Sequence, residues 1–402
     1  MTPTEASDDQ VDLIFSKALS GHSLFKDRTT LRNEYIPAKI QFRDVQITKT
    51  AQIMAPLLTG HKPSNILLYG KTGTGKTVVA KFILKRLVEK ASNSGVNITI
   101  SYVNARNAST QYRTLVELAS SLSIELPFTG LSMSEAFSRI LQKIREKRLK
   151  SVFVIDEIDF LVHNYEADIL YELTRSNETM PTDAFLTIIG ISNDIQFKET
   201  LDPRTLSSLN EEEVIFAPYT IDELRHILKE RAMLAFNDGI ATDPAINLCA
   251  ALAGAEHGDA RRAVDLLRVA AELAERQGSN KIEDTHVRLA TKSIEQDHVF
   301  EAVRSLPLHA KIVLLTISKA NEWAATGAVY AHYVQSCKRL GVEELTQRRV
   351  SSILTELDTF GLITAPVISQ GRMGRSKKIR LTAPLDTIIT TLREDDALKL
   401  IT

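Results

Sequence analysis

One stretch restricts the fold of this 402-residue chain more than any other: Gly70-Lys71-Thr72-Gly73-Thr74-Gly75-Lys76-Thr77. It matches the phosphate-loop pattern G-x-x-x-x-G-K-[ST] at every constrained position. The residues Ile66 to Tyr69 predict a buried strand before it, and Val78 to Leu87 predict a helix after it. Because glycines let successive N–H groups face an anion at a helix start, the stretch predicts a phosphate-binding turn.

The residue types within this turn fit a nucleoside triphosphate. Lys76 can reach the β- and γ-phosphates, and Thr77 can ligate Mg²⁺, so ATP or ADP with Mg²⁺ are the expected cofactors. A chance match in a loop of glycine and threonine is the alternative, which the flanking strand and helix disfavour. The expected nucleotide contacts in this segment are Gly73, Thr74, Gly75, Lys76, Thr77 and Val78.

Length and composition allow this interpretation without producing it. The chain is long enough for two or three domains, and its 44% hydrophobic and 25% charged residues are ordinary for a globular protein. The segment from Met1 to Asp9 is polar and acidic, unlike a secretory signal, and no apolar run approaches the ~20 residues that span a membrane. Cys249 and Cys337 lack neighbouring Cys or His, so we expect two reduced core thiols in a cytoplasmic protein.

Charge is distributed unevenly along the chain. The formal net charge of −1 argues against a general nucleic-acid coat. From Glu301 to Thr402, however, 14 Lys and Arg residues stand against 10 Asp and Glu residues, a local excess of +4. This basic excess near the C-terminus predicts a local contact with a polyanion.

A second chemical motif follows the phosphate loop by about 80 residues. The apolar run Val152 to Ile155 predicts a strand of a parallel sheet, buried on both faces, and it is followed by Asp156 and Glu157. Ligands of open α/β sheets bind at this end of the strands. We expect Asp156 to hold the Mg²⁺ shell and Glu157 to polarise the attacking water. A solvated acidic turn is the alternative.

Two more polar residues complete a pattern similar to that of the AAA+ ATPases. Asn193 follows the apolar run Phe185 to Ile191, where it can bond the γ-phosphate or the water, although an Asn there can also be a turn residue. Gly258-Asp259-Ala260-Arg261 begins an amphipathic helix and resembles the second-sensor motif, in which Arg261 reaches the γ-phosphate from a helical lid. The alternative is a surface arginine.

The arginine-finger position departs from the AAA+ pattern. Many oligomeric relatives have an arginine directly before the last apolar residue of the segment that corresponds to Leu201 to Leu209, and here Ser208 stands at that place. Arg204 is the nearby arginine, and its role stays open. Without a finger, hydrolysis is expected to be weak, because the transition-state charge lacks a donor from a partner.

The rest of the ATPase half reads as a helical lid. From Tyr219 to roughly Gln296 the pattern is helical, and Thr220 with Glu223 forms an expected capping box. Tyr219 lies at the hinge between core and lid, and Arg231 lies near the end of the first lid helix. Both are candidate nucleotide contacts, although a hinge aromatic can equally be plain packing.

The pattern changes after Phe300. Three amphipathic helices are predicted, at 308–320, 327–340 and 346–360, followed by strands at 362–367 and 379–382 around a basic turn. This order is typical of a winged helix, a variant of the helix-turn-helix.

The predicted DNA contacts come from the third helix and the basic turn. Residues at the start of such a helix meet base edges or phosphates in the major groove, and the hairpin lies against the backbone or minor groove. The alternative is a winged helix that binds protein. The candidates are Gln347, Arg348, Arg349, Ser352, Arg372, Arg375, Lys377 and Lys378.

Taken together, these motifs resemble the archaeal replication initiators related to the origin recognition complex and its helicase loader. Further stretches carry the resemblance: Leu31 to Pro37 before Phe42-Arg43-Asp44, Pro63 to Ile66, Asp202-Pro203-Arg204 and Gly258 to Arg262. It covers nearly the whole chain beyond the first twenty or so residues. One departure is Phe216 to Tyr219, where the family usually has a second proline.

The resemblance implies further site residues and an organisation. Tyr35, Ile36 and Pro37 would line the adenine pocket, with Arg43 from the same motif, and Tyr219 and Arg231 would complete it. A helical insertion would span about 105–130, with its turn Leu126 to Gly130 exposed to DNA. The expected domains are an N-terminal arm (1–30), an α/β AAA+ phosphate-loop core with a parallel sheet (31–218), an all-α lid (219–298) and an α+β winged-helix domain (299–402).

The resulting hypothesis is an ATP-regulated, sequence-specific, double-stranded DNA-binding initiator with weak ATPase activity. Its expected partners are origin DNA, the replicative helicase and other initiator paralogues, and not a membrane; its expected location is the nucleoid. Two rivals share the architecture: a Holliday-junction-type DNA motor, which needs a good trans arginine, and a signalling ATPase whose winged helix binds protein.

Overall fold

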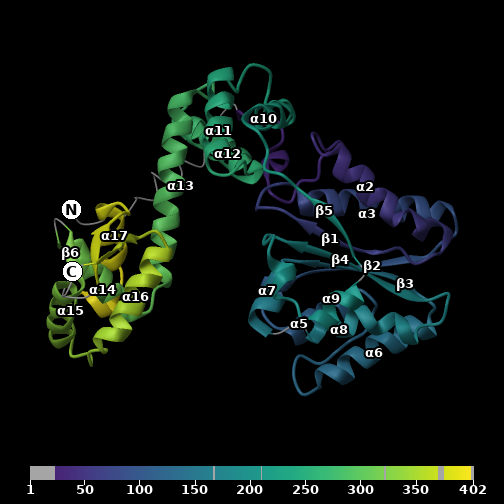
Figure 1. Cartoon of the computed structure of the whole chain (residues 1–402). Coiled ribbons are helices and arrows are strands. Elements are labelled where there is room, and N and C mark those ends of the chain that lie inside the picture. Colours follow the sequence, from purple (N-terminus) through teal and green to yellow (C-terminus); the bar gives the residue numbers. More distant parts are fainter. Residues whose placement is uncertain (1–22, 166–167, 210, 321–322, 370–374, 400–402) are drawn as a thin grey trace, which may run out of the picture. The chain divides into compact units, whose positions relative to one another are not determined.

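A computed structural model describes residues 23–165, 168–209, 211–320, 323–369 and 375–399 (Figure 1). The chain divides into two compact units, Met1–Val287 and Arg288–Thr402, and each is described by itself. Helix α13 (Asp284–Ser305) continues across this boundary. No helix in the described ranges is long and apolar enough to cross a membrane.

The first unit is built on a five-stranded parallel sheet with the strand order β2-β3-β4-β1-β5. Apart from Lys150 at the start of β3, its central strands are buried, as parallel strands covered on both faces require. The strands predicted before the phosphate loop, before Asp156 and before Asn193 are therefore confirmed. The bounds are β1 (Asn65–Tyr69), β2 (Ile98–Asn104), β3 (Lys150–Asp156), β4 (Phe185–Ser192) and β5 (Glu211–Ile215).

Alternating side chains divide the core of this unit between the two faces of the sheet. Leu67 and Phe153 point into one apolar cluster, and Ile66 and Val152 point into the other. Figure 1 shows α2 (Asp44–Met54) and α3 (Lys76–Asn93) on one face and the remaining helices of the core on the other. Those helices are α4 (Ala105–Ala108), α5 (Gln111–Ser120), α6 (Met133–Glu146), α7 (Ile158–Tyr165), α8 (Asp168–Arg175) and α9 (Pro203–Leu209).

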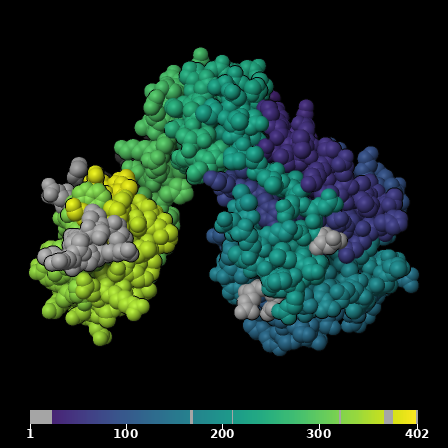
Figure 2. All heavy atoms as spheres, viewed as in Figure 1, coloured from purple at the N-terminus to yellow at the C-terminus, as the bar shows by residue number. Residues whose placement is uncertain are grey.

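Three helices follow the sheet and form the lid: α10 (Ile221–Ala235), α11 (Asp243–Ala255) and α12 (Ala260–Arg276). The predicted capping box is confirmed, because Thr220 accepts a bond from the N–H of Glu223 and the Glu223 carboxylate accepts one from the N–H of Thr220. The first described residues, purple in Figure 2, lie against these helices. There Phe25 packs on Phe236, and Lys26 N–H donates to the Ala235 carbonyl at 2.7 Å.

The second unit packs helices and an antiparallel sheet around its own apolar core. The three predicted helices are confirmed within two residues as α14 (Leu308–Ser318), α15 (Thr326–Leu340) and α16 (Gln347–Thr359). The sheet pairs β9 (Arg375–Leu381) with each of β6 (Ala324–Ala325), β7 (Ile363–Thr364) and β8 (Val367–Ser369).

Three features of this unit differ from the expectation. The single strand expected over 362–367 is divided into β7 and β8 around Ala365 and Pro366, since proline cannot donate a ladder bond. The returning strand β9 is longer than expected. A last helix, α17 (Leu385–Arg393), packs on α14 and was not predicted. Short 3-10 helices elsewhere in the chain are η1 (Arg28–Leu31), η2 (Ala55–Thr59), η3 (Ser176–Thr179), η4 (Phe197–Thr200) and η6 (Asp396–Leu398).

Candidate functional site: a nucleotide pocket and a basic winged helix

The phosphate loop turns sharply between β1 and α3. Gly73 and Gly75 have φ angles of 67° and 92°, which residues with a Cβ rarely adopt. A Cβ at Gly73 would also lie 1.7 Å from the carboxylate of Asp259, the N-cap of lid helix α12. The loop therefore needs glycine both for its backbone and for its close approach to the lid. A hydrogen bond from the N–H of Ala260 to the Gly73 carbonyl, 3.2 Å long, joins the two.

Lys76 is buried within this loop. Its Nζ donates to the carbonyls of Gly70 and Lys71 at 2.6 and 2.7 Å and to Oδ1 of Asn193 at 2.9 Å. Burial lowers the pKa of the Lys76 ammonium to about 8, with Asp156 opposing the change and Arg261 adding to it. A cation held so close to the helix start is suited to an anion of high charge density.

Two oxygen ligands suited to Mg²⁺ meet beside the lysine. Thr77 Oγ1 donates to Oδ2 of Asp156 at 2.8 Å, and the hydroxyl of Tyr102 donates to the same oxygen at 2.7 Å. Hard cations prefer such ligands, so Thr77 and Asp156 fit the expected metal. Among the described residues, no group of three or more His, Cys, Asp or Glu could hold a metal ion. Mg²⁺ commonly keeps several waters and binds through one or two carboxylates together with phosphate oxygens.

Glu157 is held in an unusual conformation directly after the strand. Its φ of 54° is left-handed, a region that non-glycine residues seldom occupy and that is often found at functional sites. Its carboxylate is paired with Arg106 Nε at 2.6 Å, and Asn104 Nδ2 donates to it at 3.3 Å. Both partners follow or end β2, the neighbouring strand. The expected base therefore follows the C-terminal end of β3, with an arginine paired to its carboxylate.

Arg261 and Asn193 reach the phosphate-loop cavity from different elements. Arg261 lines the same cavity as Lys76, Asp156, Glu157 and Asn193, together with Ile36 of the N-terminal motif. Asn193 comes from the end of β4, and Arg261 from the second residue of α12. The structure thus brings all five expected catalytic side chains to one cavity, where the lid arginine faces the loop lysine.

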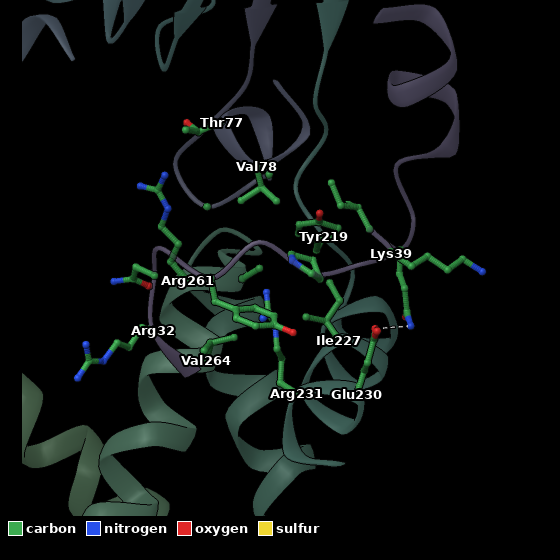
Figure 3. A pocket seen from close by; sticks show the side chains of 18 residues that line it. Arg32, Lys39, Thr77, Val78, Tyr219, Ile227, Glu230, Arg231, Arg261 and Val264 are labelled. Atoms are coloured by element: carbon green, nitrogen blue, oxygen red, sulfur yellow. Dashed lines mark hydrogen bonds between the residues drawn. The ribbon is translucent and has the colours of Figure 1, made fainter. Parts of the chain in front are cut away.

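A second cavity adjoins the first and lies between the loop and the lid (Figure 3). In Figure 3, Thr77 and Val78 approach from the loop side and Ile227, Arg231 and Val264 from the lid helices. The lining combines aromatic and aliphatic side chains, which suit a flat base, with several charged and polar ones. The expected residues that line it are Tyr35, Pro37, Gly73, Gly75, Thr77, Val78, Tyr219, Arg231 and Arg261.

The rings of Tyr35 and Tyr219 in this cavity each lie against an arginine, Arg231 and Arg43 respectively. The Arg231 guanidinium lies 4.4 Å from the ring centroid of Tyr35 and donates to the Thr30 carbonyl at 3.1 Å. Burial lowers the pKa of Arg231 and raises the pKa of Tyr219. The stacked pair fixes one wall of the cavity, which is what a base needs for recognition.

The expectation for Arg43 needs correction. Arg43 is buried and lines neither cavity, although its motif neighbours do. Its guanidinium lies 3.7 Å from the Tyr219 ring centroid, and its three donor nitrogens bond backbone carbonyls. It therefore supports the loop and hinge from behind instead of lining the nucleotide cavity.

Sequence reasoning missed several residues of the two cavities. Tyr102 and Asn104 end β2, and the β2–β3 register places Asn104 opposite Asp156, so the rule that ligands gather at strand ends could have found them. Others had no local signal, because they converge from the N-terminal motif and the lid. Gln41, for example, donates to Glu230 at 2.6 Å across 189 positions. The missed set also includes Arg32, Asn33, Glu34, Lys39, Ile40, Lys81, Ile227 and Val264.

The segment Leu201 to Leu209, where Ser208 stands at the arginine-finger position, does not line these two cavities. Arg204 is 82% exposed at its side chain and lies 5.8 Å from the ring centroid of Tyr171. Ser208 Oγ is 2.7 Å from Thr174 Oγ1, so this residue is bound within its own subdomain. Arg204 is thus an exposed cation of that surface, together with Arg175.

The expected DNA-binding residues of the second unit lie on α16 and β9. Thr346 caps α16 by accepting from the N–H of Arg349, so Gln347, Arg348 and Arg349 form its exposed first turn. Arg348 makes no side-chain hydrogen bond or ion pair with any residue that the structure describes. Arg349 instead lies 3.5 Å from Glu356 and 3.4 Å from Ser352.

The structure describes only part of the hairpin that was expected to contact DNA. Lys377 donates to Thr355 Oγ1 at 2.7 Å, which brings β9 beside α16, and Lys378 is exposed. Arg375 begins β9. Arg372 lies outside the described residues. The two lysines and the start of α16 therefore supply cations to one unit, as a polyanion-binding surface requires.

Comparison with known proteins matches three segments to family models. Residues 59–192 match an AAA domain, 225–292 the Cdc6 AAA+ ATPase-type lid domain, and 301–391 the CDC6 C-terminal winged-helix domain. The fold, with its parallel AAA+ sheet, lid and winged helix, is thereby confirmed.

Full-length relatives agree with these models. An ORC1-type DNA replication protein 1 from Sulfurisphaera tokodaii is 47% identical over 391 residues, covering 96% of this chain and 97% of that one. One from Thermococcus onnurineus is 44% identical, covering 98% and 96%. The structure of the Aeropyrum pernix ORC1 protein in complex with DNA superposes with a TM-score of 0.88 at 42% identity, covering 95% of this chain and all of that one. This chain belongs to the ORC1/Cdc6 family of AAA+ replication initiators.

Proposed function

We propose that this protein recognises replication origins as an ATP-regulated, sequence-specific binder of double-stranded DNA and helps to recruit and load the replicative helicase. The observation that carries the proposal is the likeness over nearly the whole chain to the A. pernix ORC1 protein, whose structure is of a complex with DNA. The Holliday-junction motor and the signalling ATPase gain no support of comparable extent.

Nucleotide binding follows from the two adjoining cavities. The Tyr35–Arg231 wall and Tyr219 would receive adenine, and the loop N–H groups with Lys76 would receive the phosphates. Mg²⁺, held through Thr77 and Asp156, would neutralise phosphate charge. Glu157 would accept the proton of the attacking water, which Asn193 would help to orient.

Weak hydrolysis is the expected consequence of two features. The Glu157 carboxylate is occupied by Arg106, so the base must first be released before it can accept a proton. Ser208 also stands where many relatives carry a trans arginine, which would otherwise stabilise the transition-state charge. ATP would therefore persist as a bound state, and Arg261 would report its γ-phosphate to the lid.

DNA recognition would use both units. The first turn of α16 would read base edges, and Lys377, Lys378, Arg372 and Arg375 would contact phosphates. In the first unit, Phe128 at the turn of the initiator-like insertion is 80% exposed and would be open to a DNA contact. Other initiator paralogues would bind at neighbouring sites, in the nucleoid.

Selection of duplexes from a random pool, with full-length protein and ATP, tests the proposal. We expect enrichment of one sequence motif, and slow ATP turnover that junction DNA does not accelerate. Enrichment of no motif would contradict sequence-specific recognition. Rapid turnover on four-way junctions would favour the motor, and absence of any duplex binding would favour a winged helix that binds protein.

A further inference from the structure

Arg43 is a buried cation whose three side-chain nitrogens each donate to a backbone carbonyl. Arg43 is only 4% exposed and is the N-cap residue of α2. Nε donates to the Thr74 carbonyl at 2.9 Å, Nη1 to the Phe42 carbonyl at 3.0 Å and Nη2 to the Ala217 carbonyl at 2.7 Å. Burial lowers its pKa, yet a guanidinium keeps its proton. Burying a charge costs free energy, so a residue kept at this place calls for an explanation.

The bond to Thr74 has a geometric consequence for the neighbouring amide. The Thr74 carbonyl and the Gly75 N–H belong to one planar trans peptide, so they point in opposite directions. Since the carbonyl is turned toward Arg43, the Gly75 N–H is turned away from it. Gly75 lines both cavities of the site, and its N–H donates to no other described residue.

We propose that Arg43 is a positioning residue for nucleotide binding, which sets the Gly75 N–H toward the phosphates by holding the Thr74 carbonyl from behind. It touches no nucleotide itself. A second conformation of this peptide would direct the carbonyl, and its partial negative charge, at the anion. The proposal deepens the nucleotide-binding function proposed above and rests on it.

The same guanidinium also reaches the hinge between core and lid. It bonds Ala217 and lies over the Tyr219 ring, and the N–H of Tyr219 donates to the Gly258 carbonyl at 3.2 Å, just before lid helix α12. A Cβ at Gly75 would lie 2.8 Å from the Tyr219 hydroxyl, so loop and hinge are already in contact. Arg43 therefore ties the phosphate loop to the hinge that carries Arg261.

Titration of full-length protein with fluorescent ADP and ATP tests the proposal with Arg43→Ala and Arg43→Lys. Loop N–H groups of this motif cradle phosphates that ADP and ATP share. We expect Arg43→Ala to weaken both nucleotides by the same factor, about tenfold, which corresponds to one lost hydrogen bond to a charged group. The nucleotide affinities of Arg43→Lys should lie between those of the parental protein and Arg43→Ala, because one ammonium cannot reach three carbonyls that lie in different directions.

Two controls separate this role from plain stabilisation. Lys49→Ala removes another cation of α2, whose Nζ donates to the Glu213 carbonyl of β5 at 2.6 Å, and should leave both affinities unchanged. Arg261→Ala should weaken ATP more than ADP, unlike the Arg43 variants. If Arg43→Ala does not fold, Arg43→Lys carries the test. Folded Arg43 variants with parental affinity for ADP would overturn the inference; a parental protein that binds neither nucleotide would instead overturn the proposed function.

Discussion

The nucleotide site and the basic surface of the winged helix are built in opposite ways. At the phosphate loop, the polar side chains are bonded to one another, as Lys76 is to Asn193 and Thr77 is to Asp156. On the winged helix, Arg348 is exposed and makes no side-chain bond to a described residue. A site for one small ligand is preorganised by its neighbours. On the surface for a long polyanion, Arg349 and Lys377 have partners within the unit, whereas Arg348 is left free for the partner.

This contrast predicts different responses to substitution. Within the bonded network, one change should remove a whole chemical step, because each side chain holds another in place. On the open surface, changes should be smaller and nearly additive, because each cation would meet its own phosphate or base.

The largest effect is expected from Glu157→Gln. The amide keeps the shape of the carboxylate but cannot accept the proton from water, so hydrolysis should fall by about 10²- to 10⁴-fold while ATP binding is retained. Steady-state phosphate release and a nucleotide-binding titration on the same preparation check both halves. Turnover at the parental rate would remove Glu157 from the role of base.

The next largest effect is expected from Lys76→Ala. It removes the cation that would face the β- and γ-phosphates, so ATP affinity should fall by about 100-fold, the value of two charged hydrogen bonds. Direct titration with ATP measures it. Retention of parental affinity would mean that the backbone amides alone hold the phosphates.

A smaller effect is expected on the open surface, from Arg348→Ala. If Arg348 reaches a base edge, its loss should cost about 1–3 kcal/mol on the preferred duplex and relax the sequence preference there. Quantitative binding to preferred and scrambled duplexes distinguishes these outcomes. An equal loss on both duplexes would make Arg348 a phosphate contact.

Lys378→Ala is the matched control for this substitution. It also removes one exposed cation of the same unit, but as an expected phosphate contact it should weaken all duplexes alike and reduce the salt slope by about one. An unchanged slope would remove β9 from the DNA interface.

The smallest effect, and one of opposite sign, is expected from Arg106→Ala. The side chain of Arg106 is 64% exposed while it pairs with Glu157, so the pair itself contributes little to stability. Its removal frees the base, and turnover should rise by up to about fivefold, within the ~1 kcal/mol of an exposed pair. A fall in turnover would show instead that Arg106 holds Glu157 in its working position.

Much of the fold could be predicted because each motif combines local pattern with a fixed place in a sheet. The strands before Gly70 and Asp156 are continuous apolar runs, and the capping box at Thr220 is a local signal. The division of the second hairpin strand at Pro366 could also have been anticipated from proline's missing N–H. Local chemistry of this kind is written within a few residues.

The parts that could not be predicted depend on contacts across long stretches of chain. Arg43 belongs to the nucleotide motif by resemblance, yet its partner Ala217 is 174 positions away and holds it behind the loop. The pairing of Arg106 with Glu157 spans two neighbouring strands and likewise has no local signal. Sequence pattern predicts the chemistry of the site, whereas tertiary packing decides which polar groups line its cavities.

Nuclease footprinting of full-length protein on its preferred duplex, with ATP and with ADP, tests the central claim that the nucleotide site governs the DNA surface. The account predicts that the protected stretch differs between the two nucleotides and that Arg261→Ala abolishes the difference, because that arginine would carry the γ-phosphate signal to the lid. Identical footprints with ATP, with ADP and with Arg261→Ala would contradict it and leave the ATPase core without control over DNA binding.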